Sequence, residues 1–410
     1  MGFITSMANA TMFTTYAIYQ VIALGLNPLQ LLLVGMILEV TVLIFEGITG
    51  VIADMYSRRL SVILGMFVLG FGFVLEGSAM WLGEASLLMS AFMWLLLAQV
   101  FFGIGATFIS GADTAWIVDE VGEERAGRIF LKAKRVGLFG TLVGIVLSVS
   151  LSAIGPNLPY IAGGMMYLML GIFLLIFMKE TNIVRAVCED ETSQAPSHWR
   201  SMKATWLSGA QVIGRQPVLL LVLIVTLFSG AASEGYDRLW QAFLIVDIGF
   251  PQVELQGIHL NMASWIGLIA VMSTLLSLLV MWVVEKRIDM SNERVVLRGM
   301  IVLTVARIAG VLALAFAPSF AWALVAILLF EVVRTVNGPM YDTWLNLNIE
   351  SKSRATVISM MSQSDALGQT AGGPFVGWIG KRYSVRMSLV AAAVLLAPIL
   401  AVYSRARHKR

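Results

Sequence analysis

Charged side chains inside long apolar runs are the residues of this sequence that could do chemistry. Glu39 and Glu46 lie seven residues apart in the run 30–52, so a helix would carry both on one face. An ionised carboxylate at the centre of a bilayer costs about 2.5–3.5 kcal/mol or more, so such a group faces water, a partner or the protein interior. Either residue could bind and release a proton, and Glu39 is the better candidate because it lies nearer the middle of its run. The alternative is that both are acids with structural partners.

A second charged group is compact and contains Glu234, Asp237 and Arg238. A spacing of four lets Glu234 and Arg238 pair on one helix, which would leave Asp237 as the net charge. The group is then either a self-neutralised structural element or an ion pair whose partner changes when a proton or a cation arrives. Tyr236 and Trp240 flank it with ring faces suited to a lipophilic cation, although aromatic residues in such runs more often pack.

Three further charges lie in later apolar runs. Glu331 and Arg334 are three residues apart, and we expect them to pair with each other. Arg307 has no carboxylate at helical spacing in its own run, so its partner must come from elsewhere in the fold. The candidates are Asp342, Glu331 and Asp365, the last of which is a polar site in an otherwise apolar run.

The runs that carry these charges have the length and composition of transmembrane helices. Apolar residues make up 58% of the 410, charged residues 13%, and the mean hydropathy is +0.84, whereas soluble domains are about 25% charged. About 20 apolar residues span a bilayer as a helix, and repeated runs of this kind indicate a polytopic all-α membrane protein. We predict twelve spans: 3–24, 30–52, 60–82, 87–110, 136–155, 158–178, 217–245, 258–284, 295–317, 320–345, 356–380 and 385–403.

The distribution of basic residues predicts the orientation. Most of the 28 Lys and Arg residues fall in even-numbered loops and in the C-terminal tail, so both termini are expected in the cytoplasm of a multi-pass protein of the inner (plasma) membrane. Lys381, Arg382 and Arg386 violate this rule locally. The net charge of +3 fits a cytoplasmic face on anionic lipid and gives no reason to expect nucleic acid.

The chain reads as two six-helix halves, residues 1–178 and 217–410, joined by a polar cytoplasmic linker at 179–216. Recurrent residues support this division at an offset of 229 positions. They are Asp113-Thr114 with Asp342-Thr343, Arg125-Ala126 with Arg354-Ala355, and Arg58 with Arg287. Pseudo-symmetric halves explain the offset, and chance sharing of Asp and Arg by cytoplasmic loops is the alternative.

The sequence contains little that could bind a metal or catalyse a reaction. Cys188 is the only cysteine, and His198, His259 and His408 lack the spacing of metal ligands. No nucleophile–base pair is evident, so we expect neither an enzyme nor a cofactor. The expected partners are a small molecule, protons and the bilayer, and the chain is expected to be a monomer.

One decapeptide, Gly-Val-Ile-Ala-Asp-Met-Tyr-Ser-Arg-Arg at 50–59, lies between two predicted spans. It resembles the loop between helices 2 and 3 of the major facilitator superfamily, patterned G-x-L-A-D-R-x-G-R-R/K. The positions that match are Gly50, Ala53, Asp54, Arg58 and Arg59. Ile52 stands in place of leucine, Met55 in place of the first arginine, and Ser57 in place of the second glycine. The resemblance implies two halves that rock about a central cavity lined by spans 1, 4, 7 and 10, with the loop locking the cytoplasmic side. Residues that it places at this gate, with their counterparts at other cytoplasmic loops, are Gly50, Asp54, Arg58, Arg59, Asp113, Arg125, Asp342 and Arg354.

Within the superfamily, runs such as 25–30 and 233–240 are similar to bacterial multidrug or tetracycline-type efflux members. We therefore predict proton-coupled efflux of amphipathic small molecules or drugs, a class that includes lipophilic cations. Span 5 lacks the proline of the superfamily's antiporter motif, so proton-coupled uptake of a metabolite stays open, as does a non-transporting scaffold or receptor. The candidates for the substrate cavity are Tyr16, Tyr19, Tyr236, Trp240 and Trp265, and those for proton coupling are Glu39, Glu46, Glu234, Asp237, Arg238, Glu331, Arg334 and Asp365.

Overall fold

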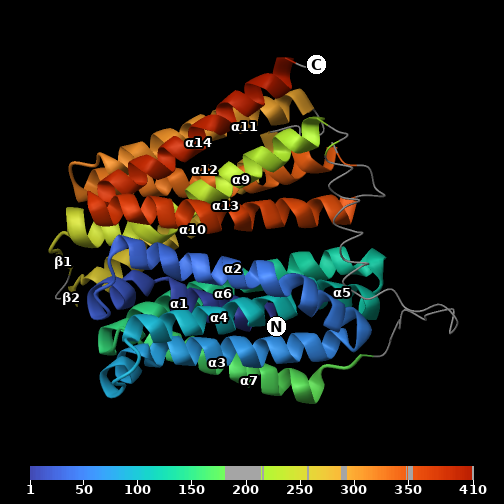
Figure 1. Ribbon diagram of the computed structural model, residues 1–410, viewed down its shortest axis with the longest axis horizontal. Coiled ribbons are helices and arrows are strands. Elements are labelled where there is room, and N and C mark those ends of the chain that lie inside the picture. Colours follow the sequence, from blue (N-terminus) through green and yellow to red (C-terminus); the bar gives the residue numbers. More distant parts are fainter. Residues whose placement is uncertain are drawn as a thin grey trace, which may run out of the picture. The chain divides into compact units, whose positions relative to one another are not determined.

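A computed structural model describes residues 1–180, 214, 217–255, 258–287, 293–347, 349 and 354–408. These residues are almost entirely helical, as their hydropathy predicts (Figure 1). In chain order the elements are α1 (Gly2–Phe13), η1 (Ile18–Ala23), α2 (Pro28–Met55), α3 (Arg58–Ala85), α4 (Ala91–Ile109), α5 (Ala112–Val121), α6 (Glu123–Ile154), α7 (Leu158–Phe177), α9 (Pro217–Phe243), η2 (Leu244–Ile248), β1 (Glu254–Leu255), β2 (Ile258–His259), α10 (Met262–Arg287), α11 (Glu293–Ala315), α12 (Phe320–Leu347), α13 (Arg354–Arg382) and α14 (Val385–His408).

The chain divides into two units. The first comprises Met1–Leu26 with Ile37–His198, and the second comprises Asn27–Met36 with Trp199–Arg410. The boundary does not coincide with the predicted halves, because the beginning of α2 is counted with the second unit. The predicted linker at 179–216, with Cys188 and His198, lies almost wholly outside the described residues.

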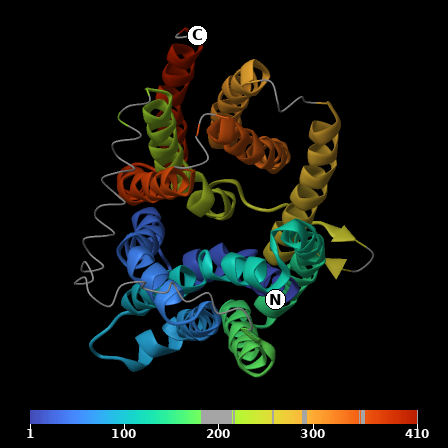
Figure 2. The same cartoon turned by 90° about the vertical axis from the view of Figure 1, so that its right-hand side faces the viewer.

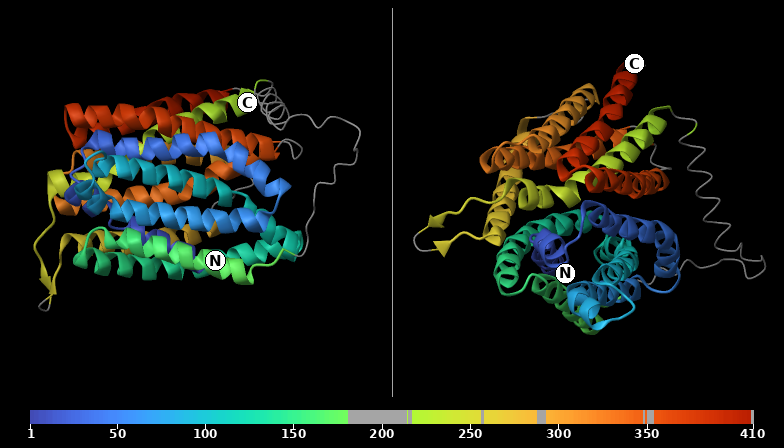
Figure 3. Two further views of the ribbon diagram at one scale, coloured as in Figure 1. Left: turned by 60° about the horizontal axis from the view of Figure 1, so that its bottom comes forward. Right: turned by 60° about the vertical axis from the view of Figure 1, so that its left-hand side comes forward.

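In the first unit, α3 packs against α4 and α7, and α1 packs against α6 and α7 (Figure 3). Glycines bring these helices together. A Cβ on Gly70 would lie 2.9 Å from the carbonyl oxygen of Gly164, and a Cβ on Gly65 would lie 2.9 Å from that of Gly105. Such close backbone approach is the way in which helices associate where lipid removes the hydrophobic driving force.

In the second unit, α9 packs against α13 and α14, while α11 packs against α12 and α14 (Figure 2). Glycines again set the distance, because a Cβ on Gly368 or Gly372 would collide with backbone carbonyls of α9. Trp344 and Tyr403 are buried at 1% and 2% exposure, and their rings lie 5.5 Å apart in the core of this unit. The short β1–β2 hairpin, which pairs Leu255 with Ile258, projects from the helices.

The short helix α5 was not predicted. Gly111 and Gly122 precede and follow it with φ of +76° and +80°, a left-handed conformation that favours glycine. The turns on both sides therefore reverse the chain without strain, and Asp113 and Asp119 are held on a ten-residue helix. The sequence signal for α5 was the pair of glycines on either side of it. Hydropathy does not detect this signal, because it measures apolarity and not backbone conformation.

The predicted spans agree with the observed helices to within about five residues, with four differences. One is that α6 begins at Glu123, thirteen residues before predicted span 5. By length and hydropathy, ten helices of the described residues can cross a membrane. Predicted span 1 is interrupted between α1 and η1, and predicted span 11, which is α13, is too polar to be counted. Predicted span 8 begins too early, because residues 258–259 form β2 and α10 starts at Met262.

Two glycines of α6 provide a matched test of close packing. A Cβ on Gly144 would collide with the Met7 carbonyl and lie 2.7 Å from Ala10 Cβ, whereas a Cβ on Gly127 would meet nothing within 4 Å. We expect Gly144→Ala to lower the stability by about 1–3 kcal/mol through overpacking. Gly127→Ala should be neutral or stabilising, by up to about 1 kcal/mol. Thermal unfolding of the two purified variants measures the difference, and equal melting temperatures would contradict it.

Candidate functional site

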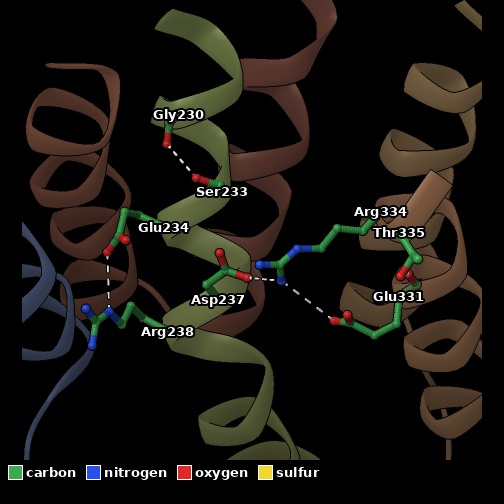
Figure 4. Close-up of polar contacts among 8 residues, drawn as sticks. All are labelled: Gly230, Ser233, Glu234, Asp237, Arg238, Glu331, Arg334 and Thr335. Carbon is green, nitrogen blue, oxygen red and sulfur yellow. Dashed lines mark hydrogen bonds and ion pairs between the residues drawn. The ribbon is translucent and has the colours of Figure 1, made fainter. Parts of the chain in front are cut away.

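The charged group on α9 splits between two sides of the helix (Figure 4). On one side Glu234 pairs with Arg238 one turn later, with Oε2 and Nε 3.4 Å apart. This pair was predicted and is confirmed. The Glu234 side chain is 8% exposed, so its charge depends on Arg238 for compensation.

On the other side of α9, Asp237 meets α12 (Figure 4). Arg334 Nη1 donates to Asp237 Oδ1 at 2.5 Å and lies 3.9 Å from Glu331 Oε1. The prediction that Asp237 remains as the net charge is wrong, because it considered one helix at a time. Arg334 is shared between a carboxylate of its own helix and a nearer one of α9, and the five charged groups together carry one net negative charge when all are ionised.

Gly35, at the beginning of α2, closes the Glu234 side of this cluster. A Cβ on Gly35 would collide with the Glu234 carboxyl group and lie 3.1 Å from Arg238 Nε. Only glycine lets the α2 backbone come so close to the ion pair. This role could not be predicted, because Gly35 lies in an ordinary apolar run.

Arg307 links the cluster to a cavity. Its side chain is almost completely buried, its Nη1 donates to Ser229 Oγ at 3.2 Å, and its Nε has no partner among the described residues. It lines a cavity of about 350 Å³ together with Asp342 and Asp365, two of its three predicted partners. It also lines a smaller cavity of about 20 Å³ with Asp237 and Arg334. Arg307 is therefore the one cation common to the linings of both spaces.

The cavity of about 350 Å³ has both apolar and polar walls. Tyr341 and Thr226 share a hydrogen bond of 2.6 Å, and Asp365 Oδ2 accepts from Gln369 Nε2 at 2.8 Å. Further lining residues are Asn337, Leu345, Ile358, Met361, Ile399 and Tyr403. A volume of this size suits a small molecule.

A larger cavity, about 570 Å³, lies in the first unit and is lined by Asp113 and Thr114. These residues are the sequence counterparts, at an offset of 229, of Asp342 and Thr343 in the second unit. Asp113 and Asp342 thus each line the cavity of their own unit. The offset of 229 positions thus relates two aspartates that both line a cavity.

The residues of the signature loop form contacts within the first unit. The Arg58 guanidinium donates to Asp119 of α5, and its backbone N–H donates to Glu180 Oε1 at 3.1 Å. Arg59 Nη2 donates to the Leu175 carbonyl at 2.8 Å. Asp119 and Glu180 were missed from the sequence, although acids near basic loop residues were the available signal.

The other predicted gate residues are placed as follows. Gly50 lies in α2 with open space at its Cβ position, and Arg125 is exposed near the beginning of α6. Asp113 accepts from the backbone N–H of Thr114 at 2.7 Å. The side chains of Asp54 and Arg354 lie outside the described part of the structure.

Four of the remaining candidates belong to the first unit. Glu39 and Glu46 are half-buried on α2. Tyr16 and Tyr19 are buried at 8% and 0% exposure, in the first unit. The hydroxyl of Tyr19 donates to the backbone carbonyl of Glu76 at 2.8 Å, which connects η1 to α3.

The aromatic candidates of the second unit differ in their surroundings. Tyr236 stacks near Phe330 with ring centroids 3.8 Å apart and lines the smaller cavity. Trp265 Nε1 donates to the Pro251 carbonyl at 3.1 Å, which places it beside the hairpin segment. Trp240 is half-buried on α9. Of the three, Tyr236 is the one that lies beside the charged cluster.

Comparison with known proteins identifies the family. The Major Facilitator Superfamily matches residues 1–372. The chain belongs to this superfamily. An uncharacterized MFS-type transporter of Bacillus subtilis (strain 168), YxaM, is 25% identical over 393 residues, which cover 95% of this chain and 90% of that protein.

Solved structures show the same fold. The nucleoside transporter NupG has a TM-score of 0.72 at 13% identity, covering 98% of this chain and 97% of its own. The D-xylose-proton symporter has a TM-score of 0.66 at 11% identity, covering 97% and 95%. At these identities the likeness concerns the fold alone. The predicted family and the all-α membrane fold are confirmed, and the chain is a multi-pass membrane transporter of the superfamily.

The contact between Asp237 and Arg334 can be measured by a double-mutant cycle. We expect Asp237→Asn and Arg334→Gln each to lower the melting temperature, because each leaves a partly buried charge without its nearest partner. The double variant should lose less than the sum, with a coupling of about 0.5–3 kcal/mol. Glu285→Gln, at an exposed glutamate near the end of α10, is the control and should change stability by no more than about 0.5 kcal/mol. Additive losses would show that the two groups do not interact.

Proposed function

We propose that this transporter exports amphipathic, cationic small molecules in exchange for protons. The observation that carries the proposal is Arg307, which lines both the cavity of about 350 Å³ and the small space beside Asp237 and Arg334. A substrate bound in the cavity would thus lie one side chain away from carboxylates that can take up a proton. The proposal includes two rocking six-helix halves, both termini in the cytoplasm, and a monomer in the plasma membrane.

Coupling follows from the limited number of cations in the cluster. Arg334 contacts Asp237 at 2.5 Å and Glu331 at 3.9 Å. A proton on Asp237 cancels its charge, so Arg334 loses its nearer partner and can turn fully to Glu331. Because an uncompensated charge is costly away from water, proton binding and the arrangement of α9 against α12 depend on each other. Glu234 and Arg238 form a second pair of the same kind on the opposite side of α9.

The cavity walls indicate the class of substrate. Asp342 and Asp365 outnumber the single cation Arg307 among the lining residues, and Tyr341, Tyr403 and apolar side chains make up much of the rest. A negative balance with aromatic and apolar walls favours a molecule that has a positive charge and an apolar body. The resemblance of runs such as 25–30 and 233–240 to multidrug or tetracycline-type efflux members favours export.

The loop residues are assigned to gating. Arg58 is tied to Asp119 on the short helix α5, and Arg59 to the end of α7. We assign Asp54, Arg58 and Arg59 to the cytoplasmic gate, so their contacts should form and break as the two halves rock. The contacts seen inside the first unit give the gate a fixed base.

Uptake is the second candidate, and one observation favours it. Arg307 and Asn337 supply to the cavity the basic and amide groups expected for a polar metabolite. Among the solved structures of the same fold, the D-xylose-proton symporter is by its name a proton-coupled sugar transporter. A non-transporting scaffold or receptor would show no flux in either direction.

Substitution of the acids tests proton coupling. In proteoliposomes with an imposed pH gradient, Glu234→Gln and Asp237→Asn should reduce uphill flux of a lipophilic cation such as ethidium to the level of empty vesicles. Exchange of labelled for unlabelled probe without a gradient should continue, because it needs no net proton movement. Glu285→Gln is the matched control, since this exposed glutamate of the second unit should keep full flux. Unchanged uphill flux in both acid variants would overturn the assignment.

The sign of the gradient tests direction. In inside-out vesicles with an acidic lumen, an exporter should accumulate the cation in the lumen and release protons to the medium. A symporter should instead accumulate a neutral pentose or nucleoside in right-side-out vesicles when the outside is acidic. The two outcomes use opposite orientations and different probes, so each identifies one candidate. Flux of neither probe in any orientation would contradict both.

A further inference from the structure

A buried glutamate in the first unit, Glu76 of α3, has no role in the function proposed above. Its side chain is 1% exposed, and α3 carries it nine residues before the helix ends at Ala85. It was not among the residues singled out from the sequence. A carboxyl group at this depth needs specific partners, because burial without them is costly.

Two glutamine amides contact the carboxyl group from two different elements. Gln20 Nε2 of η1 donates to Glu76 Oε1 at 3.1 Å, and Gln99 Nε2 of α4 donates to Oε2 at 2.9 Å. Both glutamines are buried, at 1% and 2% exposure. Each carboxylate oxygen thus accepts a hydrogen bond from a neutral donor, and an ionised carboxylate can only accept.

The side-chain amide of Gln20 also has an acceptor, Oε1, that makes no hydrogen bond to the described residues in this arrangement. Gln20 Oε1 is buried and has no hydrogen-bond partner. When Glu76 gains a proton, one of its oxygens becomes a donor, and rotation of the Gln20 amide by half a turn offers Oε1 to that O–H. Both protonation states of Glu76 can therefore be hydrogen-bonded by the same residue.

On α3 itself the other acid is Glu84, which is exposed. The sequences of α1, η1, α4 and α7 contain no Asp, Glu, Lys, Arg or His. The titratable groups that these elements bring close are Tyr19, whose hydroxyl donates to the Glu76 backbone carbonyl, and Tyr160, which Gln20 Nε2 approaches at 3.5 Å. The acids of α5, Asp113, Asp119 and Glu120, belong to the end of the unit that contains Arg58.

We propose that Glu76 is a second proton-binding site, in the first unit, and that Gln20 exchanges its donor for its acceptor when the proton binds. The proton comes from water and returns to it, and no bond other than O–H forms or breaks. Gln20 lies in η1, a π-helix in which each N–H donates to the carbonyl five residues earlier, as Leu24 does to Tyr19. The exchange of donor for acceptor therefore changes the hydrogen bond that connects η1 to α3. The proposal concerns proton binding alone and does not depend on the coupling assigned to α9 and α12.

Infrared difference spectroscopy of the purified full-length protein tests it directly, without substrate or gradient. As the pH is lowered, all acids of the protein contribute carboxylic acid C=O bands. The spectrum of the native protein minus that of Glu76→Gln should therefore leave one such band, which belongs to Glu76. Glu84→Gln, an exposed glutamate on the same helix, is the matched control and should keep the band. If the spectra of native protein and Glu76→Gln titrate identically over the pH range in which both stay folded, Glu76 does not bind a proton and the proposal is overturned.

A second variant keeps the test decisive if Glu76→Gln does not fold. Gln20→Leu removes the donor to the ionised carboxylate, and hydrogen bonds to charged acceptors are stronger than those to neutral ones. Its loss should raise the pH midpoint of the Glu76 band by about one unit. An unchanged midpoint would show that Gln20 does not sense the proton. Failure of the vesicle experiments with Glu234 and Asp237 would leave this result standing, and the reverse also holds.

Discussion

The energetic cost of charge in an apolar medium governs this structure. Helical backbones satisfy their own hydrogen bonds, and 58% of the residues are apolar and need no polar partner. Such a chain can cross a membrane repeatedly with few polar side chains to compensate. Each acid or base placed within a span then needs a partner, and partners come from neighbouring helices. Arg334, shared by Asp237 and Glu331, and Glu76, held by Gln20 and Gln99, are two solutions of this problem. One uses opposite charge, and the other uses amide dipoles.

The two units compensate their buried charges differently, although several residues recur between them at an offset of 229 positions. Asp113 and Asp342, at equivalent positions, each line a cavity. The charged clusters nevertheless lie in the second unit, while Glu76 in the first unit is bound by amides. The two units thus differ in how they compensate a buried acid: the second uses an arginine for Glu234, and the first uses glutamine amides for Glu76.

Hydropathy and local spacing were sufficient to predict the helices and the contacts made within a helix. The Glu234–Arg238 pair follows from the spacing of four, and the ends of α2, α3 and α7 lie within a few residues of the predicted spans. Contacts between helices were not predictable, because the sequence does not say which faces meet. The partner of Asp237 on α12 was therefore missed.

Two other misses have physical reasons. Glu76 is a lone acid in a long apolar run, and its partners, Gln20 and Gln99, are amides that carry no charge signal. The break between α1 and η1 lies in a segment as apolar as its neighbours, so hydropathy passed over it. The available signal was the presence of glutamines within spans, because a side-chain amide in an apolar medium needs a hydrogen-bond partner.

Gly35 has a consequence for how this family varies. The α2 backbone lies so close to Glu234 that any side chain at position 35 would occupy the place of its carboxyl group. Position 35 and position 234 should therefore covary. In homologues that keep an acid at 234, position 35 should be glycine, and in those that have lost the acid it should be free to accept alanine or serine. An alignment could thus separate the members that retain this buried ion pair from those that do not.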